Sequence, residues 1–162
     1  MKKIAIEIKW GLLFSIATLV WMIVENVVGL HDKYVSKHLI YTNLFAIIAI
    51  TIYFLALKEK KQSIFNGKMT WRQGFISGVT LSIVISLLSP LVQYITFTLI
   101  TPQFFTNIIK YAVENKVQTQ EQAEAYFSLK NYMLQGVFGG LSMGVFTSAI
   151  VAFFLKTKNY KN

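Results

Sequence analysis

Residues 8–30 read IKWGLLFSIATLVWMIVENVVGL, and this nearly uncharged stretch decides the fold. At about 1.5 Å of rise per helical residue, a stretch of this length can cross a hydrocarbon layer roughly 30 Å thick. Three further blocks of the same kind follow at residues 39–57, 74–100 and 133–155. Strands of a membrane barrel would be about half as long and would alternate in polarity. The blocks therefore predict an all-α fold, a four-helix transmembrane bundle.

The composition agrees with a membrane protein. Of the 162 residues, 54% are hydrophobic and only 14% are charged, and the mean hydropathy is +0.51. A soluble domain carries about a quarter charged residues. No linker or repeat divides the chain, so residues 1–162 are expected to form a single integral membrane domain. Glu7 and Lys9 interrupt the start of the first block and no small-residue cleavage motif follows, so this block is predicted to be a retained helix.

The distribution of charge predicts the orientation. With four spans, both termini and the middle loop lie on one side, and that side holds eleven of the sixteen basic residues. By the positive-inside rule, both termini are expected to be cytoplasmic. Five basic residues of the middle loop are expected to contact anionic lipid headgroups, or alternatively an acidic partner protein; no nucleic-acid partner is expected. They are Lys58, Lys60, Lys61, Lys68 and Arg72.

Small residues recur every fourth position on the last two spans. Such rows allow close approach of helix backbones in lipid. The third span has Gly74, Gly78, Ser82 and Ser86, and the fourth has Gly136, Gly140, Gly144 and Ser148. We expect the two rows to pack against each other within one chain, with homodimerisation through one row as the alternative.

Residues 103–131, between the last two spans, are predicted to form an amphipathic helical hairpin on the outer face. Phe105, Ile109 and Val113 place one apolar face on its first helix. Thr119 and Gln122 have the spacing of a capping box and predict the start of its second helix. That helix either stops or continues directly into the fourth span. The hairpin either caps the bundle or offers a platform for a lipid or a partner.

Every Glu, Asn and Gln within the spans falls in the predicted outer half. Polar groups at this depth are costly, so they usually face the bundle interior, face a wet cavity, or reach toward the interface. One interpretation is that Glu25 reaches the interface and pairs with Lys33 or Lys37. The other is a small polar pocket open to the outer face. Its candidate members are Glu25, Asn26, Asn43, Gln93, Tyr94 and Gln135.

No catalytic motif accompanies these residues. Glu25, His31, Asp32 and His38 could be assembled into a metal site, but their spacing matches no helical ligand pair and no known ligand motif. The sequence therefore predicts no metal and no cofactor. The chain also lacks a nucleophile elbow and a phosphate-binding loop, so a non-enzymatic protein is expected.

The layout resembles the family called domain of unknown function 4199, small four-span membrane proteins of bacteria. The resemblance covers nearly the whole chain and rests on order and spacing. It lies in MKKIAIEIKWGLLFS at the start, WRQGFISGV before the third span, TPQF after it, ENKVQTQEQAEAYF, and the glycine-rich last span ending in FFLKTKN. The resemblance implies a bacterial inner-membrane location and lipid-linked sugar transferases as a class of partner. It implies no functional residues.

Two functions therefore stay open. The first is a non-catalytic accessory or scaffold subunit that binds another membrane protein or lipid, because of the small-residue rows and the basic loop. The second is a small carrier or lipid-handling protein that uses the polar pocket. A closed hydrogen-bond network among the polar residues would favour the first, and a water-filled cleft among them would favour the second.

Overall fold

The computed structural model describes residues 4–157, which are helical apart from turns and short loops. The helices are α1 (Ala5–Val27), α2 (His38–Tyr41), α3 (Phe45–Ser63), α4 (Trp71–Ile95), α5 (Phe104–Glu114), α6 (Gln120–Tyr126) and α7 (Leu129–Leu155). Two 3₁₀ turns, Val35–Lys37 and Thr42–Leu44, flank α2, and a π-helical turn, Thr96–Ile100, extends α4.

Within residues 4–157, four helical segments are long and apolar enough to cross a membrane: Ala5–Val27, Val35–Ser63, Trp71–Ile100 and Leu129–Leu155. The chain is thus a multi-pass membrane protein, and the predicted all-α transmembrane bundle is confirmed. Only the span ends differ from the prediction. The first helix stops at Val27 instead of residue 30, because the chain turns at Gly29, where φ is +83°. The second continues past residue 57 to Ser63.

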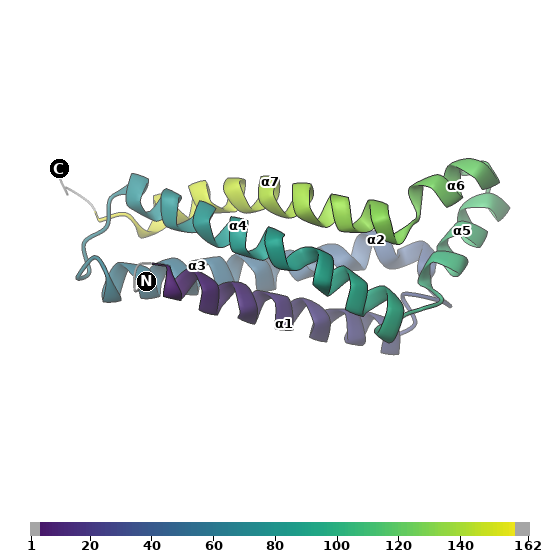
Figure 1. The fold of residues 1–162 in the computed structure, drawn as a ribbon, viewed down its shortest axis with the longest axis horizontal. Helices are drawn as coiled ribbons and strands as arrows, with labels where there is room; N and C mark the ends of the chain where they lie inside the picture. Colours follow the sequence, from purple (N-terminus) through teal and green to yellow (C-terminus); the bar gives the residue numbers. More distant parts are fainter. Residues whose placement is uncertain (1–3, 158–162) are drawn as a thin grey trace.

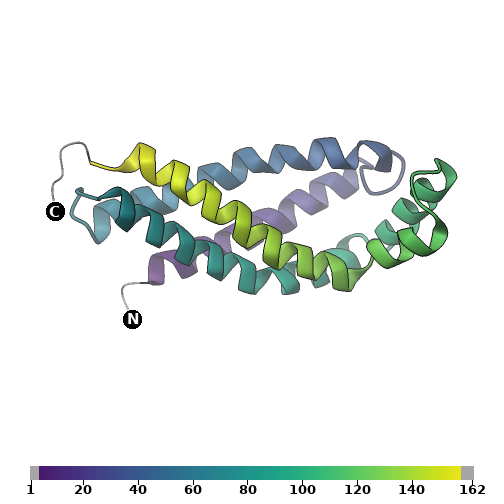
Figure 2. The same ribbon diagram turned by 90° about the horizontal axis from the view of Figure 1, so that it is seen from above.

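The bundle has two different ends (Figures 1 and 2). Ile4, Thr157 and the loop of residues 64–70 lie at one of them, which we call the terminal end. There the backbone N–H of Met69 donates to Thr157 Oγ1 at 3.0 Å, and Thr157 N–H donates to the Met69 carbonyl at 2.8 Å. The opposite end carries α5 and α6 and is called the cap end. An even number of spans thus brings the two described ends of the chain together.

The closest helix pair is α4 and α7, and it is built on the two rows of small residues. A Cβ atom placed on Gly78 would lie 2.6 Å from Ser148 Cβ and 3.2 Å from Ser148 Cα. Gly144 faces Ser82 in the same way, whereas Gly74 faces Ala152. The contact between rows that the sequence predicts is therefore present within one chain. The lipid-facing side of α7 is instead lined by large side chains, including Phe138, Phe146 and Phe154.

At the cap end, the predicted hairpin consists of α5 and α6. Phe104, Ile108 and Ala112 form the buried side of α5, and Phe104 belongs to an apolar cluster with Val35 and Phe97. The capping box of Thr119 and Gln122 is present at the start of α6. Helix α6 does not continue into the last span, because the chain breaks at residues 127–128 and the Ser128 side chain caps α7. The hairpin thus packs on the bundle as a cap.

Candidate functional site

The charge inside the first span, Glu25, lies in the last turn of α1 and is 1% exposed. Trp21, four residues earlier, donates its indole N–H to Glu25 Oε1 at 2.5 Å. The other carboxylate oxygen, Oε2, lies 3.1 Å from His31 Nε2 and 3.5 Å from His38 Nδ1. We call Glu25, His31 and His38 the carboxylate–histidine cluster. All three residues are buried.

The turn after α1 brings the two histidines back over Glu25. The Leu30 N–H donates to the Glu25 carbonyl at 2.9 Å, and the Tyr34 N–H donates to the Gly29 carbonyl at 2.7 Å. Glycine adopts the required positive φ without a steric cost. The 3₁₀ turn Val35–Lys37 then leads into α2, whose first residue is His38. The cluster is therefore assembled from a helix end and a returning loop.

Helix α5 covers the cluster on the side of the cap end. Asn107 donates its side-chain N–H to the His31 carbonyl at 2.9 Å. The Phe104 ring centroid lies 5.2 Å from that of His31 and 5.1 Å from that of His38. Since Phe104 itself is fully buried, the cap excludes water from one side of the imidazoles.

The structure does not bring the six predicted pocket residues together. Asn26 donates to the Ile100 carbonyl at 3.0 Å, and exposed Asn43 donates to the Leu39 carbonyl of its own turn. Tyr94 and Gln135 are exposed. Of the six candidates, Gln93 lines the central cavity described below. The predicted partners of Glu25 were wrong. Lys33 and Lys37 lie over the ring of Tyr34 instead, because the turn at Gly29 carries them away from the carboxylate.

Sequence spacing missed His31 and His38 as neighbours of Glu25. Ligand pairs on one helix have a fixed spacing, but here the chain leaves the helix between Glu25 and His31. Asp32, the fourth residue considered, is exposed and caps the next backbone N–H, that of Lys33. The sequence did contain a signal for this cluster: an acidic residue within an apolar span is followed, after a short loop, by two histidines.

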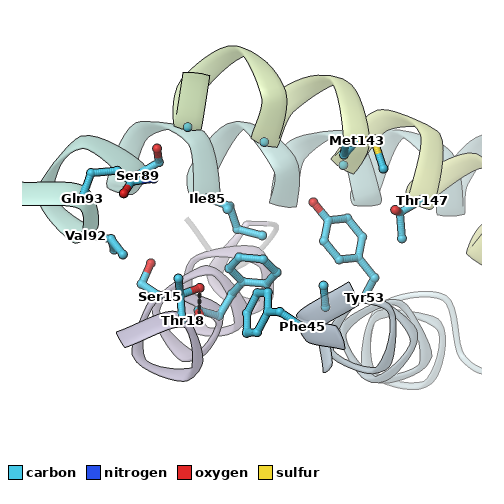
Figure 3. Close-up of a pocket in the computed structure, with 15 residues that line it drawn as sticks. Ser15, Thr18, Phe45, Tyr53, Ile85, Ser89, Val92, Gln93, Met143 and Thr147 are labelled. Atoms are coloured by element: carbon cyan, nitrogen blue, oxygen red, sulfur yellow. Dashed lines mark hydrogen bonds between the residues drawn. The ribbon is translucent and has the colours of Figure 1, made fainter. Parts of the chain in front are cut away.

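A second feature, a cavity of about 250 Å³, lies between α1, α3, α4 and α7 (Figure 3). Aromatic and aliphatic side chains dominate its wall, among them Phe14, Phe45, Tyr53, Ile85 and Met143. Glycines of α7 form one side and leave the space open. Toward the cap end the lining ends in the Ser89 hydroxyl and the Gln93 amide.

The cavity communicates with the surroundings of the bundle. Helices α3 and α7 cross and then diverge toward the cap end (Figure 2). Tyr53 contacts Gly144 where they cross, whereas Phe45 and Gly136 line the cavity farther along. Met143, on its rim, is 66% exposed. All the residues that line the cavity belong to the four candidate membrane-spanning segments.

A family model described as "Protein of unknown function (DUF4199)" matches residues 9–157, nearly the whole chain. The chain belongs to the DUF4199 family. The resemblance seen in the sequence is thereby confirmed. No curated protein and no solved structure matches this chain.

The terminal end of this DUF4199 protein holds a second buried charge network. Lys60 Nζ lies 2.7 Å from Glu7 Oε1, and the Ser77 hydroxyl donates to the same oxygen at 2.5 Å. Glu7 and Lys60 are 3% and 6% exposed. The expectation that Lys60 contacts lipid headgroups was therefore wrong, because the Glu7 carboxylate draws it into the bundle. Lys61 donates to the Leu155 carbonyl at 2.8 Å.

The other three residues of the predicted basic patch remain exposed. Lys58, Lys68 and Arg72 all lie at the terminal end, on α3, on the loop of residues 64–70, and on the first turn of α4.

Proposed function

We propose that this DUF4199 protein is a non-catalytic, lipid-handling protein of a bacterial inner membrane, and that its central cavity holds one apolar chain of a lipid. The observation that carries the proposal is the cavity between α1, α3, α4 and α7. It favours the lipid-handling alternative over a plain scaffold, since a bundle that served only as a scaffold would have its centre filled by side chains.

The lining chemistry supports a hydrocarbon occupant. The hydroxyls of Ser15 and Thr18 are already bonded to backbone carbonyls of α1, those of Gly11 and Phe14. They therefore offer little to a polar ligand. The volume of about 250 Å³ lies below the 300–1,000 Å³ typical of sites that enclose a whole drug-sized molecule. A segment of one acyl or isoprenoid chain fits this space, and a complete lipid does not.

The end of the cavity nearest the cap end is suited to a polar group at the end of the bound chain. Ser89 Oγ is buried without a hydrogen-bond partner among the described residues. Buried hydroxyls are normally satisfied, so a bound group that accepts or donates a hydrogen bond here would be stabilised. The Gln93 side chain lines the same end. The ester or hydroxyl group of a lipid could bond to Ser89 and Gln93 while its apolar chain extends through the cavity toward Tyr53.

Filling the cavity tests this proposal. Ala49 of α3 lines it, whereas Ala46, on the same helix, is exposed to the membrane. In proteoliposomes containing a phospholipid with a photoreactive acyl chain, we expect strong crosslinking to the peptide that carries Met143. Ala49→Leu should lower that crosslinking at least fivefold, because the added methyl groups occupy the chain's space. Ala46→Leu makes the same chemical change and should leave it unaltered.

Uniform crosslinking over all lipid-facing surfaces, or equal crosslinking in both variants, would exclude a cavity-bound chain. Retained lipid, measured by native mass spectrometry after mild detergent extraction, provides an independent reading. Wild-type protein and Ala46→Leu should each retain one lipid that Ala49→Leu loses.

For the orientation, we propose cytoplasmic termini, supported by the excess of basic residues on that side. Because the chain has no native cysteine, single cysteines report the topology without interference. In intact cells, a membrane-impermeant maleimide should label Glu121→Cys but label Ser63→Cys only after permeabilisation. The reverse pattern would place the termini outside.

An accessory role fits this proposal. The exposed basic residues Lys58, Lys68 and Arg72 would hold the terminal end against anionic headgroups. A membrane enzyme that consumes lipids, such as a lipid-linked sugar transferase, is the class of partner that a chain-holding protein would serve. The small-residue rows do not favour a homodimer, since each is already covered by the other.

A further inference from the structure

We infer that the carboxylate–histidine cluster is a binding site for a divalent transition-metal ion, with Zn²⁺ as the representative ion. Glu25, His31 and His38 each offer one ligand atom, and these three atoms lie within 4.8 Å of one another. This inference is independent of the lipid-handling function, because the cluster and the cavity share no residue.

The separations suit a tetrahedral ion. Zinc binds nitrogen and carboxylate oxygen at about 2.0–2.1 Å, so neighbouring ligands in a tetrahedral site are about 3.3 Å apart. Glu25 Oε2 lies 3.1 Å from His31 Nε2 and 3.5 Å from His38 Nδ1. Two of the three ligand pairs thus already have the required spacing, and only the two imidazoles need to approach each other.

The donor set also indicates the class of ion. Two imidazole nitrogens and one carboxylate oxygen suit zinc, cobalt and nickel, whereas magnesium and calcium prefer sites made of oxygen. Three protein ligands leave one tetrahedral position for water or another small ligand. The side chain of His38 is 10% exposed while those of Glu25 and His31 are 1% exposed, so an ion would enter past His38.

The hydrogen bonding of the cluster is incomplete without an ion. His38 Nδ1 is buried and has no hydrogen-bond partner among the described residues, although it lies 3.5 Å from Glu25 Oε2. A buried imidazole nitrogen without a partner is destabilising. Coordination to an ion shared with Glu25 and His31 would satisfy it.

Groups around the cluster hold the ligands in position. Trp21 binds Glu25 Oε1 and so directs Oε2 toward both histidines. Asn107 holds the backbone of His31. Hydrogen bonds from neighbouring groups to the ligating residues orient those ligands, and their loss typically lowers metal affinity about 10–100-fold. Trp21 is therefore a positioning residue for the site.

The test uses tag-free protein in mild detergent, stripped with a chelator, because a polyhistidine tag would itself bind metal. Co²⁺ serves as a spectroscopic substitute for Zn²⁺. We expect one equivalent of Co²⁺ to give the intense visible absorption of a tetrahedral site, and Zn²⁺ to displace it. Mg²⁺ and Ca²⁺ should not compete. Glu25→Gln and His38→Gln should each weaken Zn²⁺ binding more than tenfold, and Trp21→Phe about tenfold.

Asp32→Asn is the matched control, since Asp32 is an exposed acid next to His31 that supplies no ligand to the cluster. It should bind Zn²⁺ as wild type does. A wild-type spectrum that stays octahedral, or equal Zn²⁺ affinity in wild type and His38→Gln, would overturn the inference and leave the cluster as a metal-free hydrogen-bond network. The wild-type spectrum decides the matter even where a variant fails to fold.

Discussion

Gly78→Leu is expected to abolish the packing of α4 on α7 and to destabilise the protein by more than about 3 kcal/mol, the upper end of the usual range for overpacked cores. Even a Cβ atom at this position would lie 3.2 Å from Ser148 Cα. Because that neighbour is backbone, no change of rotamer can relieve the contact, and the helices must separate. Equilibrium unfolding in mixed micelles measures the loss.

Gly139→Leu is the matched control for this change. Gly139 lies on α7, and a Cβ atom there would meet nothing within 4 Å. Its replacement should therefore not destabilise the protein, and the better helix propensity of leucine should add up to about 1 kcal/mol. If Gly78→Leu kept wild-type stability but changed the oligomeric state, the row would belong to an interface between copies of the chain.

Lys60→Met should destabilise the protein by about 3–5 kcal/mol, because it leaves the Glu7 carboxylate buried without its ion-pair partner. Glu7 is 3% exposed and would keep only hydrogen bonds such as the one from Ser77. Lys58→Met provides the comparison. It removes an exposed lysine from the same helix and should have little effect.

Removing both charges distinguishes this explanation from a simple loss of packing. In Glu7→Gln/Lys60→Met neither charge of this pair remains, so most of the lost stability should return; replacing a whole buried pair is often close to neutral. A double variant less stable than Lys60→Met alone would contradict the role assigned to the pair.

The sequence was sufficient for the spans because each helix in lipid must carry a long apolar run, whatever its neighbours are. It was also sufficient for the rows of Gly78 and Gly144, since close helix approach needs small residues at fixed spacing. The capping box at Thr119 is local and was read correctly for the same reason. Each of these features depends on residues that lie close together in the sequence.

Features made by distant contacts were not accessible in this way. Lys60 looks like any basic residue of a membrane-flanking loop, and only its proximity to Glu7, 53 residues away, explains its burial. His31 and His38 reach Glu25 through a turn at Gly29, and helix α5, distant in the sequence, contacts this segment through Asn107. The cavity arises from the divergence of α3 from α7, and hydropathy carries no information about crossing angles.

The two buried acids of α1 have a consequence for the membrane around the protein. Glu7 and Glu25 are 18 residues apart, which is five turns of helix, so they project from the same face about 27 Å apart. One is fixed by Lys60 and the other by the histidines, so α1 can neither rotate nor slide to follow its surroundings. A bilayer of different thickness must then stretch or thin around the protein unless the whole bundle tilts, and either response costs fractions of a kcal/mol for each ångström of mismatch. The spacing of two carboxylates thereby selects the hydrocarbon thickness in which this protein is most stable.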